Sequence, residues 1–496
     1  MFENDARGIE DLHKLNAWRR YQSTLSFILY VAARRLFPEN KLRIEHSMSR
    51  GFYCLLYRGL TLTDIKKLES EMRSIIKEDV AIERAFYSRR KAKTLFKKAR
   101  LLDKVRFLEN VRTQRVAVYT LDYLIDMYAV PPFESTGTVP FFYLEEFRPG
   151  FVMVFPLWQD LTALPKFIAQ PKLARIFNEH VEWAKILGIR DVGGLNHAIE
   201  RGEGPEIVKV SEALHEKKIV YIADRIVKEK QKVILIAGPS SAGKTTFTKR
   251  LAIQLIVNGI RPVIIATDDY FLPHNKTPKD EFGRLDFESI KAVDVSLLNQ
   301  HLIKIIQGKE VILPKFNFLT GRRNKGEKVS LPKTGGVVLL EGIHCLNEEL
   351  TLKVPKSIKF KIYISALTQL NIDDHNRIST TDTRMIRRIV RDTHFRGYKV
   401  QEILRHWSRV RRGEERNIYP FQEEADEMFN SALIYEPAVL TKFCVSLLTR
   451  IKKKHPEYEE AKRLLDFFSL FSDLNERDVP SNSILREFIG GSSFIY

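Results

Sequence analysis

Residues 233–246, VILIAGPSSAGKTT, join an apolar, β-branched run to a glycine loop that ends in Lys244 and Thr245. The next residues, FTKRLAIQL, place apolar side chains at helical spacing, so the loop should connect a buried strand to a helix N-terminus. The spacing Gly-x4-Gly-Lys-Thr lets backbone N–H groups converge on phosphate oxygens at that N-terminus. The pattern predicts an α/β fold with a nucleoside triphosphate site, and a purely structural turn is the alternative.

The members of this loop have different expected roles. Lys244 should place a positive charge on the phosphates, and the Thr245 hydroxyl should contact Mg²⁺. ATP and Mg²⁺ are therefore the expected cofactors. The remaining phosphate-binding positions are expected at Gly238, Ser240, Ser241, Ala242, Gly243 and Thr246.

Length and composition limit the class of protein. A chain of 496 residues is too long for one compact core, and its net charge of +19 favours anionic partners such as nucleotides or RNA, or a solvated basic face. The three cysteines form no C-x-x-C pair, which indicates a reducing compartment and no zinc knuckle. No apolar run approaches the roughly 18 residues of a membrane span, and no secretion signal is evident, so we expect a cytoplasmic protein without a membrane partner.

The first part of the chain, residues 1–156, is predicted to be an α+β unit. It contains an amphipathic helix over 60–77 with Thr63 as the expected cap, and two short strands within 141–156 that break at Pro149-Gly150. Residues 157–230 read as a helical, basic connector with turns at Gly193-Gly194 and at 202–205.

Strands alternate with helices through residues 231–424, which predicts a doubly wound, mostly parallel sheet. The last part, 425–496, is predicted to be helical with a tail containing Gly-Gly-Ser. The chain is thus expected to have four parts, with the nucleotide loop in the third.

Acidic residues follow two further predicted strands. The strand 262–267 delivers Asp268 and Asp269 to its C-terminal end, where a carboxylate could accept a proton from a substrate hydroxyl. The strand 337–340 ends at Glu341, which could hold Mg²⁺ directly or through water. Alone, each acid would more often be a cap or a surface charge. Because open α/β sheets bind ligands at the C-terminal ends of their strands, the three strand ends together indicate one site.

A run of arginines is expected on one helix face. Arg384, Arg387, Arg388 and Arg391 stand at positions i, i+3, i+4 and i+7, and Arg396 follows. Phosphoryl transfer spreads negative charge over oxygens that arginines can neutralise, so beside a nucleotide loop this run is interpreted as a lid over ATP. A solvated basic helix or an RNA-binding face is the alternative.

The region 231–420 resembles the uridine kinase and phosphoribulokinase family of P-loop kinases. The matches are Asp268 in TDDYF, Glu341 in EGI, and RRIVRDTHFRG over 387–397. The resemblance implies that Asp268 is the catalytic base and that Asp286 holds acceptor hydroxyls. It also implies that Arg388, Arg391 and Arg396 stabilise the transferred charge, with Arg388 also at the acceptor.

The acceptor site departs from that family. Its aromatic pair, Tyr-Asp-Phe, stands here as Phe316-Asn317-Phe318, and the histidine expected three residues later is Gly321. Phe316 and Phe318 can still enclose a flat ring, but a tyrosine hydroxyl and an imidazole are absent from these positions. Weak discrimination between nucleobases is therefore expected.

Residues 22–156 resemble the second N-terminal domain of threonyl-tRNA synthetase, which edits mischarged tRNA. Residues 51–53, 60–84 and 121–127 carry this match. The four positions that carry histidine and cysteine in that domain hold Ser23, Phe27, Tyr128 and Pro132. We therefore expect no metal and no editing activity in this part of the chain.

The sequence as a whole predicts ATP-dependent phosphorylation of a hydroxyl on a small acceptor, with uridine or cytidine as the first candidates. A synthetase-like part joined to a kinase-like part is an arrangement associated with proteins labelled uridine or nucleoside kinase. The alternatives are a kinase of a non-nucleoside sugar or polyol, an RNA-binding regulatory ATPase, and a degraded kinase that serves as a scaffold. Weak binding of RNA or another anion, and a homo-oligomer, are further expectations; no role is predicted for the tail.

Overall fold

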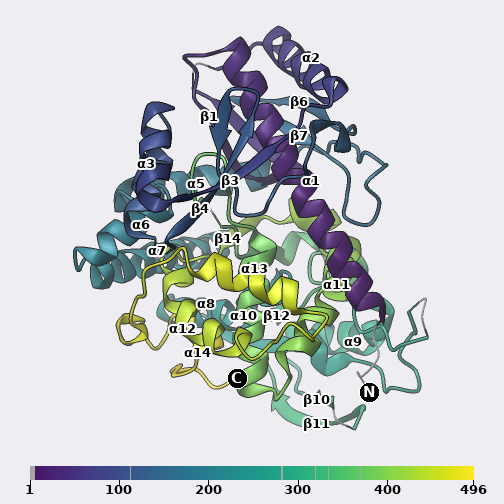
Figure 1. The fold of residues 1–496 in the computed structure, drawn as a ribbon. Coiled ribbons are helices and arrows are strands. Elements are labelled where there is room, and N and C mark those ends of the chain that lie inside the picture. The colour runs from purple at the N-terminus through teal and green to yellow at the C-terminus, as the bar shows by residue number, and fades with distance from the viewer. Residues whose placement is uncertain are drawn as a thin grey trace. The chain divides into compact units, whose positions relative to one another are not determined.

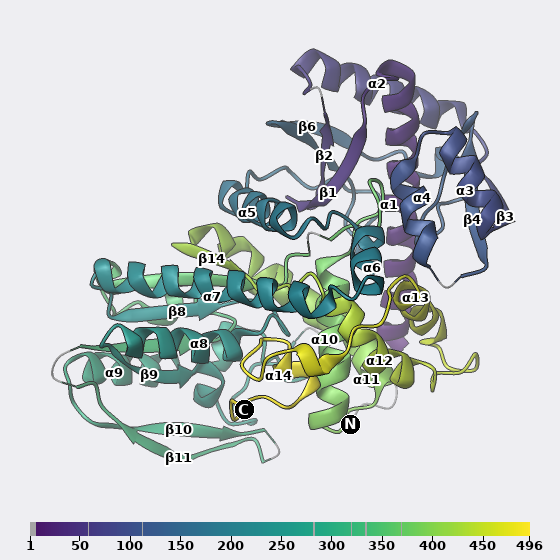
Figure 2. The ribbon, with the colours of Figure 1, turned by 90° about the vertical axis from the view of Figure 1, so that its left-hand side faces the viewer.

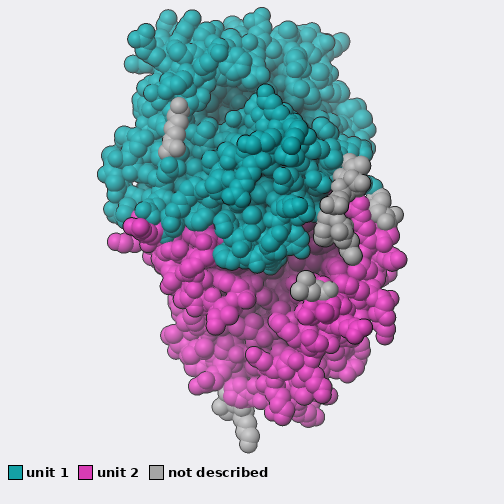
Figure 3. Space-filling view, turned by 60° about the horizontal axis from the view of Figure 1, so that its bottom comes forward, with its two compact units in different colours: residues 1–208, 368–406, 434–476 teal, residues 209–367, 407–433, 477–496 magenta. Residues whose placement is uncertain are grey.

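The computed structural model describes residues 6–57, 59–111, 113–280, 283–318, 320–332, 335–368 and 370–496. The chain forms two compact units, and each unit is assembled from three separate segments (Figure 3). Unit 1 comprises residues 1–208, 368–406 and 434–476, and unit 2 comprises residues 209–367, 407–433 and 477–496. The division into 1–156, 157–230, 231–424 and 425–496 stays a prediction.

Unit 2 is built on a parallel sheet of five strands. Every residue of β8 and β13 is buried, as expected for strands covered on both faces. This confirms the predicted α/β fold with a parallel sheet. In the order β14-β13-β8-β12-β9, the strands are β14 (Glu427–Asn430), β13 (Lys359–Ser365), β8 (Val233–Ala237), β12 (Gly336–Glu341) and β9 (Arg261–Ala266).

Helices α8 and α9 pack on this sheet, and α7 and α11 each begin in unit 1 and continue into unit 2. An antiparallel hairpin of β10 (Val311–Asn317) and β11 (Arg322–Val329), which sequence analysis did not predict, lies apart from the sheet (Figure 2). The helices are α7 (Gly204–Lys228), α8 (Lys244–Val257), α9 (Val295–Ile306), α11 (Val400–Asn417) and the short α14 (Arg486–Ile489).

Unit 1 has two antiparallel sheets. The first has the order β1-β2-β7-β6, and the second has the order β3-β4-β5. The two short strands predicted within 141–156 are confirmed as β6 and β7. The strands are β1 (Leu42–Met48), β2 (Gly51–Leu56), β3 (Glu83–Ser88), β4 (Arg115–Leu121), β5 (Leu124–Asp126), β6 (Tyr143–Phe147) and β7 (Gly150–Val154).

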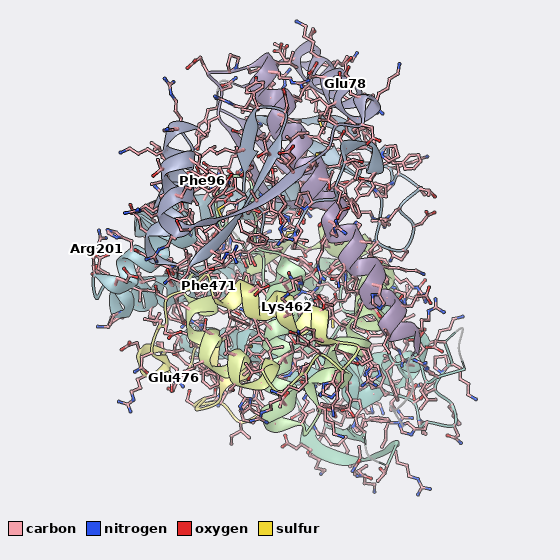
Figure 4. The ribbon with its side chains drawn as sticks, in the orientation of Figure 1. Glu78, Phe96, Arg201, Lys462, Phe471 and Glu476 are labelled. Carbon is pink, nitrogen blue, oxygen red and sulfur yellow. The ribbon has the colours of Figure 1, made fainter. Side chains whose placement is uncertain are left out.

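The helices of unit 1 include the long α1, drawn in purple in Figure 1, and α2, which ends at Glu78 (Figure 4). Helix α3 buries Phe96, the labelled side chain on that helix in Figure 4. The helices are α1 (Ala6–Leu36), α2 (Leu62–Glu78), α3 (Arg89–Lys98), α4 (Leu102–Asn110), α5 (Pro171–Leu187), α6 (Val192–Glu200), α10 (Thr380–Phe395), α12 (Glu436–Leu448) and α13 (Tyr458–Phe468). Among the residues described, no helix is long and apolar enough to cross a membrane.

Two local predictions in unit 1 are wrong. The cap of α2 is Thr61 rather than Thr63, because Thr61 and Asp64 form a reciprocal capping box. Gly193 and Gly194 form the first turn of α6 rather than a break between helices. A Cβ atom on Gly193 would lie 2.9 Å from the Phe107 Cα, so close packing on α4 explains the glycine.

A buried charge cluster joins residues 370–379 to the N-terminal part of unit 1. The Lys104 Nζ lies 2.8 Å from Asp126 Oδ1 and 2.9 Å from Asp373 Oδ1, and all three side chains are fully buried. His375 Nδ1 lies 2.7 Å from the second Asp126 oxygen. Burial opposes the charge of Lys104, but Asp126 and Asp373 raise its pKa, so the paired charges fix this segment in the core.

Candidate active site

The glycine loop joins β8 to α8, as predicted, and two of its glycines have clear structural causes. Gly243 caps α8 with φ 83°, a left-handed conformation that glycine adopts without strain. At Gly238 a Cβ atom would lie 2.1 Å from the Ile364 carbonyl oxygen of the adjacent strand β13. The loop therefore turns tightly at the end of the central strand, where the first N–H groups of α8 have no acceptor within the helix.

Lys244 folds back over this loop. Its Nζ donates to the carbonyl oxygens of Gly238 at 2.9 Å and Pro239 at 3.2 Å. On the other side of the loop, the Ser240 N–H donates to Glu414 Oε1 at 3.0 Å. The ammonium group of Lys244 and the N–H of Ser240 thus both lie on the glycine loop. Phosphate binding by such a loop uses donors of these two kinds.

Glu341 ends β12 and contacts α8. Its two carboxylate oxygens accept hydrogen bonds from the Thr245 hydroxyl at 3.2 Å and the Thr248 hydroxyl at 3.3 Å. Burial raises the pKa of Glu341 to about 7; Lys244 opposes the rise, and Glu487 and Asp268 add to it. Carboxylate and hydroxyl oxygens are ligands that Mg²⁺ accepts, so the residues predicted to hold it, Thr245 and Glu341, fit the ion.

The two neighbouring acids after β9 have different surroundings. Asp269 accepts a hydrogen bond from the Phe316 N–H at 3.2 Å and pairs with the Lys315 Nζ at 3.3 Å. It thereby holds the hairpin strand β10. Asp268 is exposed, and its charge reaches Glu341 strongly enough to raise the pKa of that acid.

The aromatic pair Phe316 and Phe318 belongs to a larger cluster. Their ring centroids are 5.0 Å apart, and the ring of Phe271 lies 5.8 Å from Phe316 and 6.0 Å from Phe318. Phe287 lies 6.2 Å from Phe316. No local pattern in the sequence marks Phe271 and Phe287 as members of this cluster, because they stand on loops far from β10 in the sequence.

An imidazole occupies the space beside Gly321. A Cβ atom on Gly321 would lie 2.3 Å from the His274 ring, and the two backbones are joined by the His274 N–H donating to the Gly321 carbonyl at 3.2 Å. The His274 ring also lies 5.7 Å from Phe287. The glycine that the sequence showed in place of a histidine thus accommodates a histidine from another loop.

Asp286 lies in the loop between β9 and α9, where its side chain is half-buried. Its Oδ1 accepts the Glu288 N–H at 3.1 Å, and its own N–H donates to the Pro278 carbonyl at 2.8 Å. These bonds fix the loop around a carboxylate whose Oδ2 could accept a ligand hydroxyl.

The predicted lid arginines lie on α10 and just after it, in unit 1. Arg384 and Arg387 are fully buried, so the prediction of one cationic face is wrong for these two, and the Arg387 Nη2 donates to Glu436 Oε2 at 2.7 Å. Arg388, Arg391 and Arg396 instead converge on the buried Asp392, with N–O distances of 3.2, 2.8 and 3.6 Å. One carboxylate therefore gathers the three arginines assigned to charge stabilisation.

The C-terminal segment returns to the start of α8, a contact that sequence analysis did not find. The Thr246 hydroxyl donates to Glu487 Oε2 at 2.7 Å, and the Thr246 N–H approaches the same oxygen at 3.3 Å. The Tyr496 hydroxyl lies 2.8 Å from the Thr246 hydroxyl. These partners are 241 and 250 positions apart, and no local pattern marks them.

In unit 1, three of the four positions aligned with the editing site lie close together. The Phe27 and Tyr128 rings are 5.3 Å apart, and Ser23 and Tyr128 line the same cavity of about 420 Å³. The Tyr128 hydroxyl donates to Asp126 Oδ2 at 3.0 Å. At the fourth position, the Pro132 carbonyl accepts from Arg20 at 3.0 Å.

A parallel sheet with a glycine loop, a lysine and a strand-end acid is typical of P-loop nucleotide-binding proteins. The chain belongs to the phosphoribulokinase / uridine kinase family, whose model matches residues 233–434. A uridine kinase of Borrelia hermsii is 33% identical over 199 residues, which cover 39% of this chain and 84% of the relative. A uridine kinase of Deinococcus deserti is 27% identical over 208 residues, covering 42% of this chain and 91% of the relative.

Among solved structures, one described as a possible uridine kinase from Bacillus stearothermophilus is similar with 18% identity and a TM-score of 0.29. It covers 43% of this chain and 98% of its own. The family membership establishes an ATP-dependent kinase of a small molecule, and kinases of this family typically use Mg²⁺.

Proposed function

We propose that this kinase transfers the terminal phosphoryl group of ATP to a hydroxyl of a nucleoside, with uridine or cytidine as the first candidates. The observation that carries the proposal is the arrangement at the C-terminal edge of the unit 2 sheet. There Glu341 ends β12 in register with Ile236 of β8 and Ala266 of β9, so the glycine loop with Lys244 and the acid Asp268 follow the two neighbouring strands at the same edge. The similarity to uridine kinases supports the nucleoside as acceptor.

Each residue has a role in this proposal. The loop 238–246 and Lys244 bind the ATP phosphates, and Thr245 and Glu341 hold Mg²⁺, which would neutralise phosphate charge. Asp268 accepts the proton of the attacking hydroxyl, the role that the family resemblance implies for it, whereas the neighbouring Asp269 binds the hairpin strand β10. Arg388, Arg391 and Arg396 stabilise charge on the transferred group, and Asp286 binds the acceptor hydroxyls.

A screen of acceptors for ADP release tests the proposal. Uridine and cytidine are expected to stimulate ADP release with similar kcat/KM, and ribose and inositol are expected to be poorer. Stimulation by a polyol alone would make the alternative, a sugar or polyol kinase, correct. ATP turnover that no acceptor stimulates would instead favour an RNA-binding regulatory ATPase. The net charge of +19 would suit the binding of RNA in that role.

The aromatic cluster and His274 suggest how the nucleobase of an acceptor would be recognised. Phenylalanine rings offer only stacking, whereas an imidazole nitrogen can donate to or accept from a base edge. His274→Phe keeps a ring at this position and removes the hydrogen bond. Because a neutral hydrogen bond contributes about 1 kcal/mol, kcat/KM for the nucleoside should fall about fivefold.

Ribose, which has no base, is the matched control substrate for His274→Phe. Its kcat/KM should be unchanged in the variant. An equal loss for the nucleoside and for ribose would mean that His274 supports the loop rather than the base.

We also propose that residues 1–156 form a synthetase-like domain that has lost its metal. The closeness of Phe27 and Tyr128 and the cavity shared by Ser23 and Tyr128 support a common site at these positions. The full chain, purified without chelator, should contain no stoichiometric zinc, because none of the four side chains is a zinc ligand. Elemental analysis that finds one tightly held metal per chain would contradict this assignment.

A further inference from the structure

The C-terminal segment 477–496 lies outside the family match at 233–434 and within unit 2. Its short helix α14 lies beside α8 in both ribbon views (Figures 1 and 2). Glu487 of α14 accepts the hydrogen bond from the Thr246 hydroxyl, and the Lys249 Nζ donates to the Ile495 carbonyl. The segment therefore contacts the first two turns of the helix that follows the glycine loop.

Thr246 is the third residue of α8, so its N–H has no acceptor within the helix. In a glycine loop of this kind such N–H groups bind phosphate oxygens. A carboxylate resembles a phosphate in charge and in its pair of acceptor oxygens. Glu487 thus lies where an anionic ligand of the loop would bind, as Glu414 does at the Ser240 N–H.

The placement of Glu487 is built into the fold. Ile484, Leu485 and Phe488, the neighbours of Glu487 in sequence, are fully buried. Arg486 closes the turn by donating to the Val479 carbonyl at 2.6 Å and to the Gly490 carbonyl at 3.3 Å. The anchored turn holds the carboxylate at α8, while the side chain of Glu487 itself is only half-buried.

We propose that Glu487 is a built-in competitor of the nucleotide at Thr246, so that ATP binds fully only after the Glu487 carboxylate has left. Two anions cannot share one N–H and one hydroxyl, and their charges repel each other. The apparent affinity for ATP is therefore the intrinsic affinity multiplied by the fraction of molecules in which Glu487 has left α8. This inference rests on the proposed assignment of the loop 238–246 to the phosphates.

Removal of the charge tests the competition directly. Glu487→Gln keeps the size of the side chain but loses the anion, and hydrogen bonds to charged groups contribute about 1.5–3 kcal/mol. The Kd for ATP, measured by calorimetry without acceptor, should fall about tenfold or more. Asp478→Asn, which removes the charge of an exposed acid in the same segment, is the matched control and should leave Kd unchanged.

Glu487→Asp is the second variant, because the shorter side chain withdraws the carboxylate from Thr246 without neutralising it. It should also tighten ATP binding, and both variants should melt at the temperature of the native chain. An unchanged Kd in folded variants overturns the competition. Weaker binding also overturns it and would make Glu487 a part of the ATP site.

The proposed loop assignment is tested separately by Lys244→Ala in the same calorimetric assay. If the native chain binds ATP and Lys244→Ala does not weaken the binding, the loop assignment fails, and the inference about Glu487 fails with it. If Lys244→Ala weakens ATP binding but the Glu487 variants do not tighten it, the inference alone is wrong.

Discussion

Replacement of Lys244 by alanine should lower the rate of phosphoryl transfer by about 100-fold or more, because removal of one preorganised charge-stabilising group commonly has that effect. The Nζ of Lys244 lies 2.9 Å from the Gly238 carbonyl, above the loop that we assign to the phosphates. There the positive charge of Lys244 can stabilise the negative charge that develops on the phosphate oxygens during transfer. Steady-state ADP release with a saturating acceptor measures the loss.

The fold should survive this substitution. Lys244 begins α8, and its side chain bonds two carbonyl oxygens of the loop rather than the core. Lys309→Ala, which removes an exposed lysine of the same unit, controls for net charge and should keep native activity. Near-native transfer by a folded Lys244→Ala variant would show that the glycine loop is a structural turn.

The sequence predicted those parts of the site that depend on neighbours along the chain. The strand, loop and helix at 233–257 follow one continuous local pattern of an apolar run, a glycine loop and helical spacing, and the acids at the ends of β9 and β12 follow apolar runs that a parallel sheet requires. The helix cap at Thr61 could also have been found, since Asp64 completes its capping box three residues later.

Contacts between loops that are far apart in the sequence were not predicted, because no repeat of apolar residues or short motif indicates them. His274 fills the space beside Gly321, and only the three-dimensional structure shows that the glycine and the histidine form a pair. Arg384 and Arg387 have the same spacing as exposed lid arginines, but they are buried, and Arg387 pairs there with Glu436. Helical spacing predicts which residues share one face of a helix. Tertiary packing decides whether that face is buried.

The same limit explains why two adjacent acids looked alike in the sequence. Asp268 and Asp269 both follow β9, and only the family resemblance favoured the first as base. The structure adds a physical distinction, because the carboxylate of Asp269 is bonded to the hairpin strand β10 through Phe316 and Lys315. The two positions should therefore respond differently to the same chemical change.

Asp268→Asn should lower kcat by about 10²–10⁴-fold, the usual contribution of a general base, with a small change in KM. Asparagine keeps the shape of the side chain but cannot take the proton of the attacking hydroxyl. Asp269→Asn should mainly raise KM for the acceptor, since it loosens the strand that carries Phe316, and should spare most of kcat. Initial rates over a range of acceptor concentrations separate the change in kcat from the change in KM. If kcat/KM fell equally in both variants through KM, with kcat unchanged, the role of Asp268 as base would be wrong.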